Sequence, residues 1–342
     1  MRRYFCPHCA NEVHFDNTVC VKCSSNLAYS SSIDGFRVSA APSLSVSTSD
    51  HYCANRDLIG CNWVVEHNEQ SQFCVSCRHT LVIPDLSAAP NVERWARLEG
   101  AKRLLFYGLQ KFHLPLDGRG DKLNQGLRFE LKSDLLPVVG QQTKTMTGHK
   151  AGVITINIME ADDDVREQHR VEMGEPYRTL IGHFRHEVGH YYWDRLVADA
   201  GQMDAFRAMF GDERISYTDA LQRHYQSGAL LGWETRYVSS YASSHPWEDF
   251  AETWAHYFHI VDGLETAQSY AIGAPAPREE VYRGPYESKD FAALINAWVP
   301  LTVAMNAMNR SIGNHDFYPF ILSDPISAKL QFIHNLIHNF GA

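Results

Sequence analysis

The sequence predicts an α+β fold in which a helix-rich domain follows a small cysteine-rich region. Three observations favour this fold class. All eight cysteines lie between Cys6 and Cys77. Leu127–Leu131 and Gly152–Ile158 have alternating apolar or β-branched residues and predict short strands. Downstream of them, apolar residues recur at helical spacing almost to the end of the chain.

The composition permits a sizeable core, because 44% of the 342 residues are apolar. No apolar run approaches the ~18–20 residues that cross a bilayer. The first residues, MRRYFCPHCANEV, lack the apolar segment of a secretory signal. We therefore expect a cytoplasmic protein with no membrane partner. The net charge of −9 disfavours nucleic acid as a partner, and residues 1–84 carry six Lys or Arg against seven Asp or Glu.

Two Cys-x2-Cys pairs near the N-terminus predict a metal site. Each pair can present two thiolates from one tight turn, and together they complete a tetrahedral zinc site. The alternative is a disulfide or redox pair, but such a pair would normally stand alone. The predicted ligands of this first structural zinc are Cys6, Cys9, Cys20 and Cys23.

A second set of cysteines has a looser spacing but also favours a structural zinc. The alternative is a set of reduced, buried cysteines. Nearby His8, His51 and His79 could substitute as ligands, but with eight cysteines available we expect ordinary surface histidines. A Ser-rich linker, Ser39–Ser49, separates the two sets. The predicted ligands of the second zinc are Cys53, Cys61, Cys74 and Cys77, and residues 1–84 form a double zinc-ribbon region with little other core.

Residues 90–342 are predicted to form the second domain. It opens with a long amphipathic helix from Val92, followed by the two strands. Asp162–Asp164 then predict a solvated helix start, with an acidic Ca²⁺ site as the alternative. The last two helices have wide apolar faces that we expect in the core. The remaining predicted helices are Tyr177 to Ala200, Met203 to Phe210, Thr218 to Ser227, Trp247 to Ala267, Asp290 to Asn309 and Ile326 to Phe340.

His186-Glu187-Val188-Gly189-His190 is the most specific motif of this domain. It lies in a stretch without proline that can be helical throughout. Positions four apart share one face of a helix, so His186 and His190 can hold one metal ion. Glu187 then lies beside the ion, where its carboxylate can take a proton from water. The pattern predicts the centre of a zinc hydrolase, although the five-residue motif also arises by chance.

A catalytic zinc site needs a third protein ligand. A third histidine six residues after His190 is excluded, because Leu196 stands there. Glu248 on a later helix is the candidate, with Glu252 one turn further able to accept the outer N–H of a ligating imidazole. The reverse assignment, Glu252 as ligand, stays open. Asp249 should face solvent or cap the helix.

Tyr241 is the candidate donor to a developing oxyanion, with His245 as a weaker alternative. The competing interpretation is a tyrosine that only packs in the core. His183, His256 and His259 are expected to have no role at a metal.

The strings HEVGHYYWDRL and YASSHPWEDFAETWAHYFHIVDGLETA, with CPHCANEVHFDNTVCVKC at the N-terminus, resemble a bacterial family of zinc-binding metallopeptidases that carry an N-terminal zinc ribbon. The site is also similar to the Glu-type zincins, such as thermolysin and anthrax lethal factor. The resemblance implies Glu248 as ligand and a mechanistic role for Tyr241. It also implies that Gly152–Ile158 pairs with an extended peptide substrate. Glu248 lies 58 residues after His190, a long gap that departs from that pattern.

The expected function is therefore zinc-dependent hydrolysis of a peptide or protein, with one catalytic and two structural zinc ions. Glu187 would act as general base and Tyr241 as oxyanion donor. Two alternatives remain. One is a DNA-associated protease of the SprT type, whose ribbon binds nucleic acid. The other is a non-enzymatic, zinc-stabilised binding module in which the histidine motif is vestigial.

Overall fold

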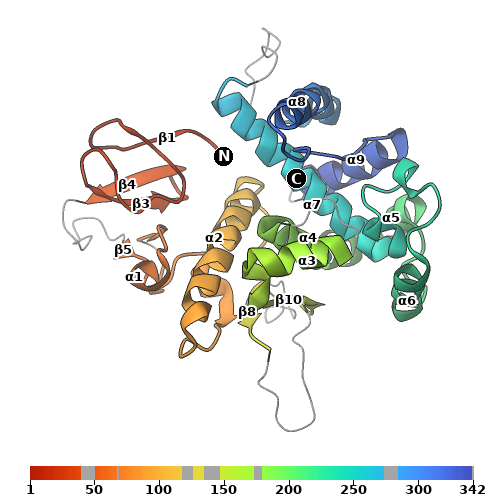
Figure 1. Ribbon diagram of the computed structural model, residues 1–342, viewed down its shortest axis with the longest axis horizontal. Coiled ribbons are helices and arrows are strands. Elements are labelled where there is room, and N and C mark those ends of the chain that lie inside the picture. The colour runs from red at the N-terminus through yellow and green to blue at the C-terminus, as the bar shows by residue number, and fades with distance from the viewer. Residues whose placement is uncertain are drawn as a thin grey trace. The chain divides into compact units, whose positions relative to one another are not determined.

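A computed structural model describes residues 1–39, 51–67, 69–117, 126–134, 147–172, 179–272 and 284–340. The chain divides into two compact units, Met1–Arg166 and Glu167–Ala342. It combines many helices with small sheets (Figure 1), which confirms the predicted α+β class. The Ser-rich linker, apart from Ser39, lies outside the described residues.

The first unit begins with three antiparallel strand pairs and one short helix. The pairs are β1 (Tyr4–Phe5) with β2 (Glu12–Val13), β3 (Asn26–Ser30) with β4 (Gly35–Ser39), and β5 (His51–Tyr52) with β6 (Val64–Val65). Helix α1 is Arg56–Ile59. Contrary to expectation, this region has a core of its own. The Tyr29 ring packs edge-on against Phe15 and at a tilt against Trp63, with ring centroids 4.9 and 5.1 Å away.

A long helix and a four-stranded sheet complete the first unit. Helix α2 (Ala89–Lys111) confirms the predicted long helix, although it is not amphipathic throughout, because nearly all residues from Leu98 to Leu109 are buried. The sheet has the order β7-β8-β10-β9, in which β9 alone runs antiparallel to its neighbour. Its strands are β7 (Thr80–Val82), β8 (Arg128–Lys132), β9 (Gly148–Lys150) and β10 (Val153–Asn157).

The position of β10 corrects one expectation. Residues Val153–Thr155 pair with β8 on one side and with β9 on the other. Their main-chain groups are therefore already occupied and cannot pair with a peptide substrate. Among the described residues, β9 rather than β10 forms that edge of the sheet.

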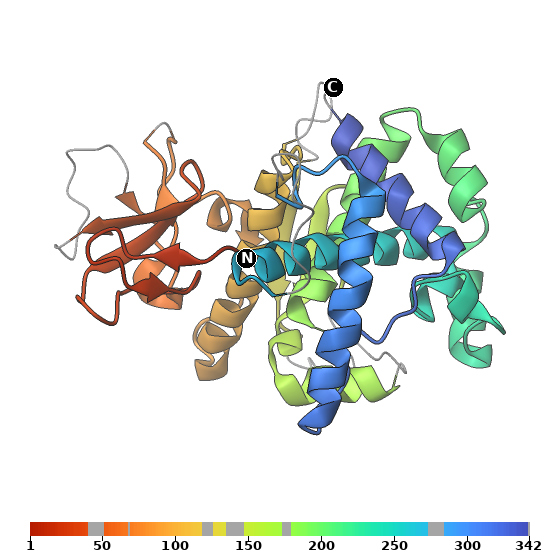
Figure 2. The same cartoon turned by 90° about the horizontal axis from the view of Figure 1, so that it is seen from above.

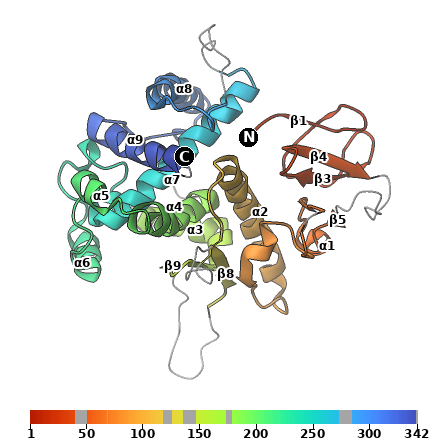
Figure 3. The same ribbon diagram turned by 180° about the vertical axis from the view of Figure 1, so that it is seen from behind.

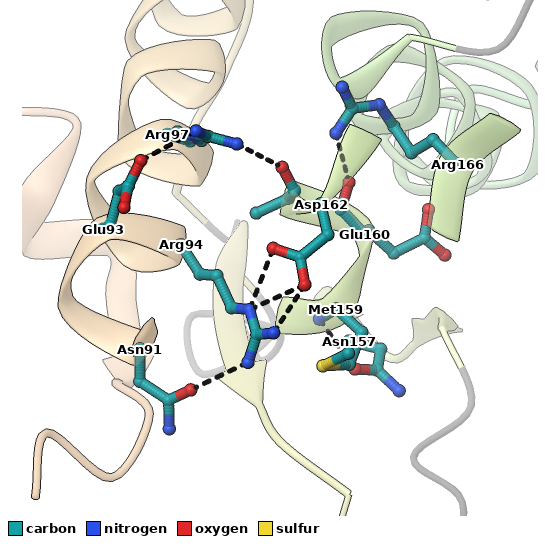
Figure 4. Close-up of polar contacts among 10 residues, drawn as sticks. Asn91, Glu93, Arg94, Arg97, Asn157, Met159, Glu160, Asp162 and Arg166 are labelled. Carbon is teal, nitrogen blue, oxygen red and sulfur yellow. Dashed lines mark hydrogen bonds and ion pairs between the residues drawn. The ribbon is translucent and has the colours of Figure 1, made fainter. Parts of the chain in front are cut away.

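The acidic run after the sheet is engaged in structural contacts. Asp162 forms a forked ion pair with Arg94 of α2, with Nε–Oδ1 and Nη2–Oδ2 distances of 2.9 and 2.5 Å (Figure 4). Arg97 donates to the carbonyl of Ala161 at 3.2 Å. These bonds join α2 to the short 3₁₀ turn η3 (Ile158–Ala161), which precedes α3 (Asp163–Glu172). Asp162 thus binds an arginine, and no acidic metal cluster is found here among the described residues.

The second unit is built around two helices, α4 (Leu180–Trp193) and α7 (Pro246–Ser269), which pack side by side (Figure 3). The Thr179 side chain caps α4 by accepting from the Gly182 N–H at 3.1 Å. Beyond Trp193 the helix widens into a π turn, η4, Asp194–Ala198. The other helices are α5 (Met203–Phe210), α6 (Tyr217–Ser227), α8 (Phe291–Ser311) and α9 (Asp324–Asn339), with short turns η5 (Trp233–Thr235) and η6 (Tyr241–Ser244).

The helices α8 and α9 both pack against α7 (Figure 2) but differ in burial. Helix α9 buries Ile326, Leu330 and Ile333, as the sequence predicts for a core helix. Helix α8 leaves Val303 and Met308 exposed. By length and composition alone α8 could cross a membrane, although the core helix of a soluble protein passes the same test. The expectation that no segment approaches this length was wrong.

Candidate metal centre

The first four cysteines converge at the two turns that carry them. Their sulfur atoms all lie within 4.8 Å of one another. Sγ–Sγ distances are 3.7 Å for Cys6–Cys23 and 3.6 Å for Cys9–Cys20. A tetrahedral zinc with ~2.3 Å bonds to sulfur requires sulfurs ~3.8 Å apart, so the spacing fits. Ala10 and Ser24, each next after a cysteine pair, have positive φ angles of 56° and 57°, which turn the chain around the site.

The second four cysteines also converge, although their spacing in the sequence is looser. The Sγ atom of Cys61 lies 3.7 Å from those of Cys74 and Cys77, and all four sulfurs lie within 4.8 Å. All eight cysteines are free of disulfides. His79 is buried rather than on the surface, since its Nδ1 lies 2.6 Å from the Val75 carbonyl oxygen. Burial lowers the pKa of His79 to about 4, so it stays neutral.

His186 and His190 of α4 meet Glu248 of α7 in a third cluster. Glu248 Oε2 lies 3.0 Å from His186 Nε2 and 3.5 Å from His190 Nε2. A tetrahedral zinc with ~2.0–2.2 Å bonds places such donors ~3.4 Å apart. Burial raises the pKa of Glu248, but the charges of His190 and His186 hold it well below its usual range. Glu248 therefore presents an ionised oxygen to both imidazoles.

Glu252 contacts the edge of the His186 ring that points away from Glu248. Its Oε1 lies 2.6 Å from Nδ1, the ring nitrogen opposite the one that faces Glu248. Its Oε2 accepts from Ser239 Oγ at 2.6 Å. In the neutral imidazole that a metal requires as ligand, Nδ1 as donor leaves Nε2 as the lone-pair nitrogen. These distances favour Glu248 as the metal ligand and Glu252 as the residue that orients His186.

Close approach of the two helices depends on Gly189. A Cβ atom added there would lie 2.9 Å from the Ala251 Cα and 3.2 Å from the Ala251 carbonyl oxygen. Such contacts with backbone are too short, so α4 and α7 could not pack this closely with a larger residue. The glycine inside the motif thus brings His190 within reach of Glu248.

Glu187 lies beside the cluster with one carboxylate oxygen engaged. Its Oε1 is 3.4 Å from His183 Nε2, so this histidine has a contact that the sequence did not predict. Burial raises the pKa of Glu187, but the His183 hydrogen bond and nearby histidine charges outweigh it and lower the pKa. Glu187 is therefore ionised and able to accept a proton.

Tyr241 is also beside the cluster, at the start of η6. Its ring centroid lies 5.8 Å from that of His186. Burial, and then the negative charge of Glu248, raise the pKa of Tyr241 well above its usual value. The phenol keeps its proton and can act as a hydrogen-bond donor.

Several other predicted residues have structural contacts. The Nδ1 of His245 caps α7 by accepting from the Trp247 N–H at 3.0 Å, so His245 is a capping residue. His256 Nδ1 lies 2.7 Å from the Tyr318 hydroxyl. Asp249 is fully buried and pairs with Lys329 Nζ at 2.5 Å, so the expectation that it faces solvent was wrong.

Two residues near the cluster were missed by sequence analysis. The Tyr217 hydroxyl donates to Glu248 Oε1 at 2.6 Å. The Trp247 ring lies against His190, with centroids 3.8 Å apart. Trp247 directly precedes the proposed ligand Glu248, which was the only signal available for it. Tyr217 comes from α6, and no local pattern links it to this site.

The polar atoms that face this cluster fit a bound cation. Glu248 Oε2 and Glu187 Oε2 are buried and have no hydrogen-bond partner among the described residues. A buried ionised oxygen without a partner is costly, and a metal ion with its water would satisfy both. Two imidazole nitrogens and a carboxylate are a donor set that suits zinc and leaves a coordination position open.

The chain resembles known sequences over nearly its full length. A family model described as "Putative zinc-binding metallo-peptidase" matches residues 91–336, and one described as "zinc-ribbon domain" matches residues 3–88. Uncharacterized proteins of Mycobacterium bovis and of two Mycobacterium tuberculosis strains are each 40% identical over 339 residues. The match covers 98% of this chain and 95% of each relative. No solved structure matches the chain.

Proposed function

Because the chain belongs to this family of zinc-binding metallopeptidases, we propose that it is a zinc-dependent peptidase that hydrolyses peptide bonds. The observation that carries the proposal is the cluster of His186, His190 and Glu248, with the ionised Glu187 beside it. Its substrate is a peptide or protein, and its site is of the Glu-type zincin kind.

His186, His190 and Glu248 would hold the catalytic zinc. When bound, zinc lowers the pKa of a coordinated water toward ~7 and polarises the substrate carbonyl. Glu252 and Ser239 hold the His186 ring in the orientation that directs Nε2 into the site. The Trp247 ring packs against the His190 ring and restrains its orientation by contact.

Glu187 is the proposed general base. Its Oε2 takes a proton from the attacking water and later returns it to the leaving amine. The contact with His183 holds Oε1, so Oε2 is the free oxygen for this transfer. Tyr241 keeps its phenolic proton and donates to the oxyanion that develops on the scissile carbonyl.

The two four-cysteine clusters are proposed to hold structural zinc. Each supplies four sulfurs at tetrahedral spacing, which leaves no position for a substrate or water. We also propose a cytoplasmic location, because cysteines that bind zinc must stay reduced.

The decisive experiment compares wild type with Glu187→Gln on a peptide library, alongside zinc content by elemental analysis. The isosteric amide cannot accept the proton, so cleavage should fall by about 10²–10⁴-fold while zinc per chain stays unchanged. His190→Ala is the matched control, and it should lose one zinc and all activity. Full activity in Glu187→Gln would disprove the mechanism. A wild-type protein that carries this zinc but cleaves no peptide would favour the binding-module alternative.

A further inference from the structure

We propose that Tyr217 is a positioning residue that makes Glu248 bind zinc through one oxygen only. The inference rests on the proposed function, because it concerns how the same site holds its metal. The Tyr217 hydroxyl donates to Oε1 of Glu248 at 2.6 Å. The other oxygen, Oε2, faces His186 and His190 at 3.0 and 3.5 Å. One oxygen of the carboxylate is thus tied back by a phenol and the other is directed into the site.

The hydrogen bond from Tyr217 ends at the buried carboxylate of Glu248, so its loss should change how Glu248 binds the metal. Glu248 is 1% exposed, so its carboxylate is shielded from bulk water. A charge-assisted hydrogen bond in such surroundings is stronger than one at a surface. Without it, the carboxylate could rotate and bind the metal through both oxygens. The second oxygen would then occupy the position that a zinc hydrolase reserves for water.

Helix α6 is built to deliver this contact. Ser216 caps its start, with Oγ accepting from the Asp219 N–H at 3.3 Å. Just before the cap, Glu213 forms a two-pronged ion pair with Arg207 of α5, at 2.9 and 2.5 Å. Ala220 alone is buried among the residues of the helix, so α6 adds little to the core.

The same helix also touches the proposed oxyanion donor. His224, two turns after Tyr217, lies on the same face of α6. Its ring centroid is 5.9 Å from that of Tyr241. One face of α6 therefore contacts both the third ligand and Tyr241. The helix falls within the long segment between His190 and Glu248, so that segment supplies a part of the site that the ligand motifs do not contain.

The test is the zinc affinity of Tyr217→Phe, measured by chelator competition on the full chain. The histidine-held zinc is defined as the ion that His190→Ala lacks. Loss of the hydroxyl should weaken this zinc by about 10–100-fold, as expected for a residue that orients a ligand. Zinc in the cysteine sites should be unchanged. Tyr225→Phe makes the same chemical change at an exposed position of the same helix and should bind zinc like wild type.

A crystal structure of zinc-loaded Tyr217→Phe supplies a second readout. We expect both Glu248 oxygens at bonding distance from the metal, about 2.0–2.2 Å, instead of one. Wild-type affinity together with one-oxygen binding in the variant would overturn the inference. Equal thermal destabilisation of the metal-free and zinc-loaded variant, at unchanged affinity, would show a purely structural role. Because no substrate is involved, these results stand apart from any failure to find peptidase activity.

Discussion

The two cysteine clusters and the His–Glu cluster bring their metal-binding atoms together in different ways. Each cysteine cluster draws four sulfurs from short, turn-rich stretches, Cys6–Cys23 and Cys53–Cys77. The third cluster draws three donors from two long helices, α4 and α7, and further residues hold those donors in place. We infer that zinc would organise the chain at the first two sites, whereas at the third the folded helices organise the donors.

The largest expected effect comes from breaking a cysteine cluster. Structural zinc contributes roughly 10–16 kcal/mol of apparent folding free energy in small zinc domains. Cys20→Ser should therefore abolish hydrogen-exchange protection in the turns that carry the first cluster, Cys6–Cys23. His190→Ala should lose its zinc while α7 keeps near-wild-type protection, because side-chain packing such as that of Tyr192 on Trp254, with ring centroids 4.9 Å apart, also joins α7 to α4. Zinc content and hydrogen exchange, measured on both variants, show whether loss of each zinc also unfolds the residues around it. Unfolding of α7 in His190→Ala would remove the distinction between the two kinds of site.

The sequence predicted the donors because their patterns are local. Two cysteines separated by two residues belong to one turn, and two histidines four apart share one helical face. The same holds for Glu248 and Glu252, whose i, i+4 relation places both on one face of α7. These relations depend only on backbone geometry within one element.

Apart from Glu252, the residues that hold those donors were not predictable, because no pattern around the donors points to them. Tyr217 lies 31 residues before Glu248 and contacts it only through the packing of α6. Asp249 was assigned to solvent from the geometry of its own helix, which carries no information about α9. The aromatic core of the ribbon region was missed for the same reason, since Phe15, Tyr29 and Trp63 meet only in three dimensions.

A smaller effect is expected from the buried ion pair that joins α9 to the start of α7. Lys329 Nζ lies 2.5 Å from Asp249 Oδ2 and donates to the Arg236 carbonyl at 2.8 Å. Lys329→Met leaves a carboxylate in the core without its partner, which typically costs about 3–5 kcal/mol. Chemical denaturation should show this loss in the second unit, with zinc in the cysteine sites unchanged. Adding Asp249→Asn removes the buried charge and should recover part of the stability. No recovery would mean that the lysine acts through packing instead of charge.

The smallest effect tests whether helix packing sets the geometry of the third cluster. In Gly189→Ala the new methyl group would lie 2.9 Å from the Ala251 Cα, so α4 and α7 must separate slightly. Overpacking of this kind costs about 1–3 kcal/mol, partly offset by the up to ~1 kcal/mol that alanine gains in a helix. Gly100→Ala in α2 is the matched control, since its Cβ would meet only the Arg103 side chain at 3.8 Å and should not destabilise the protein.

Zinc affinity gives Gly189→Ala its second readout. Ala251 lies one turn after Glu248 on α7, so separation of the helices also moves Glu248 away from His190. If the fold organises the donors, the histidine-held zinc should weaken together with stability, and the cysteine-held zinc should not change. If zinc binding were unaffected while stability fell, the metal would be pulling the helices into place. The third cluster would then resemble the cysteine sites in how it is assembled.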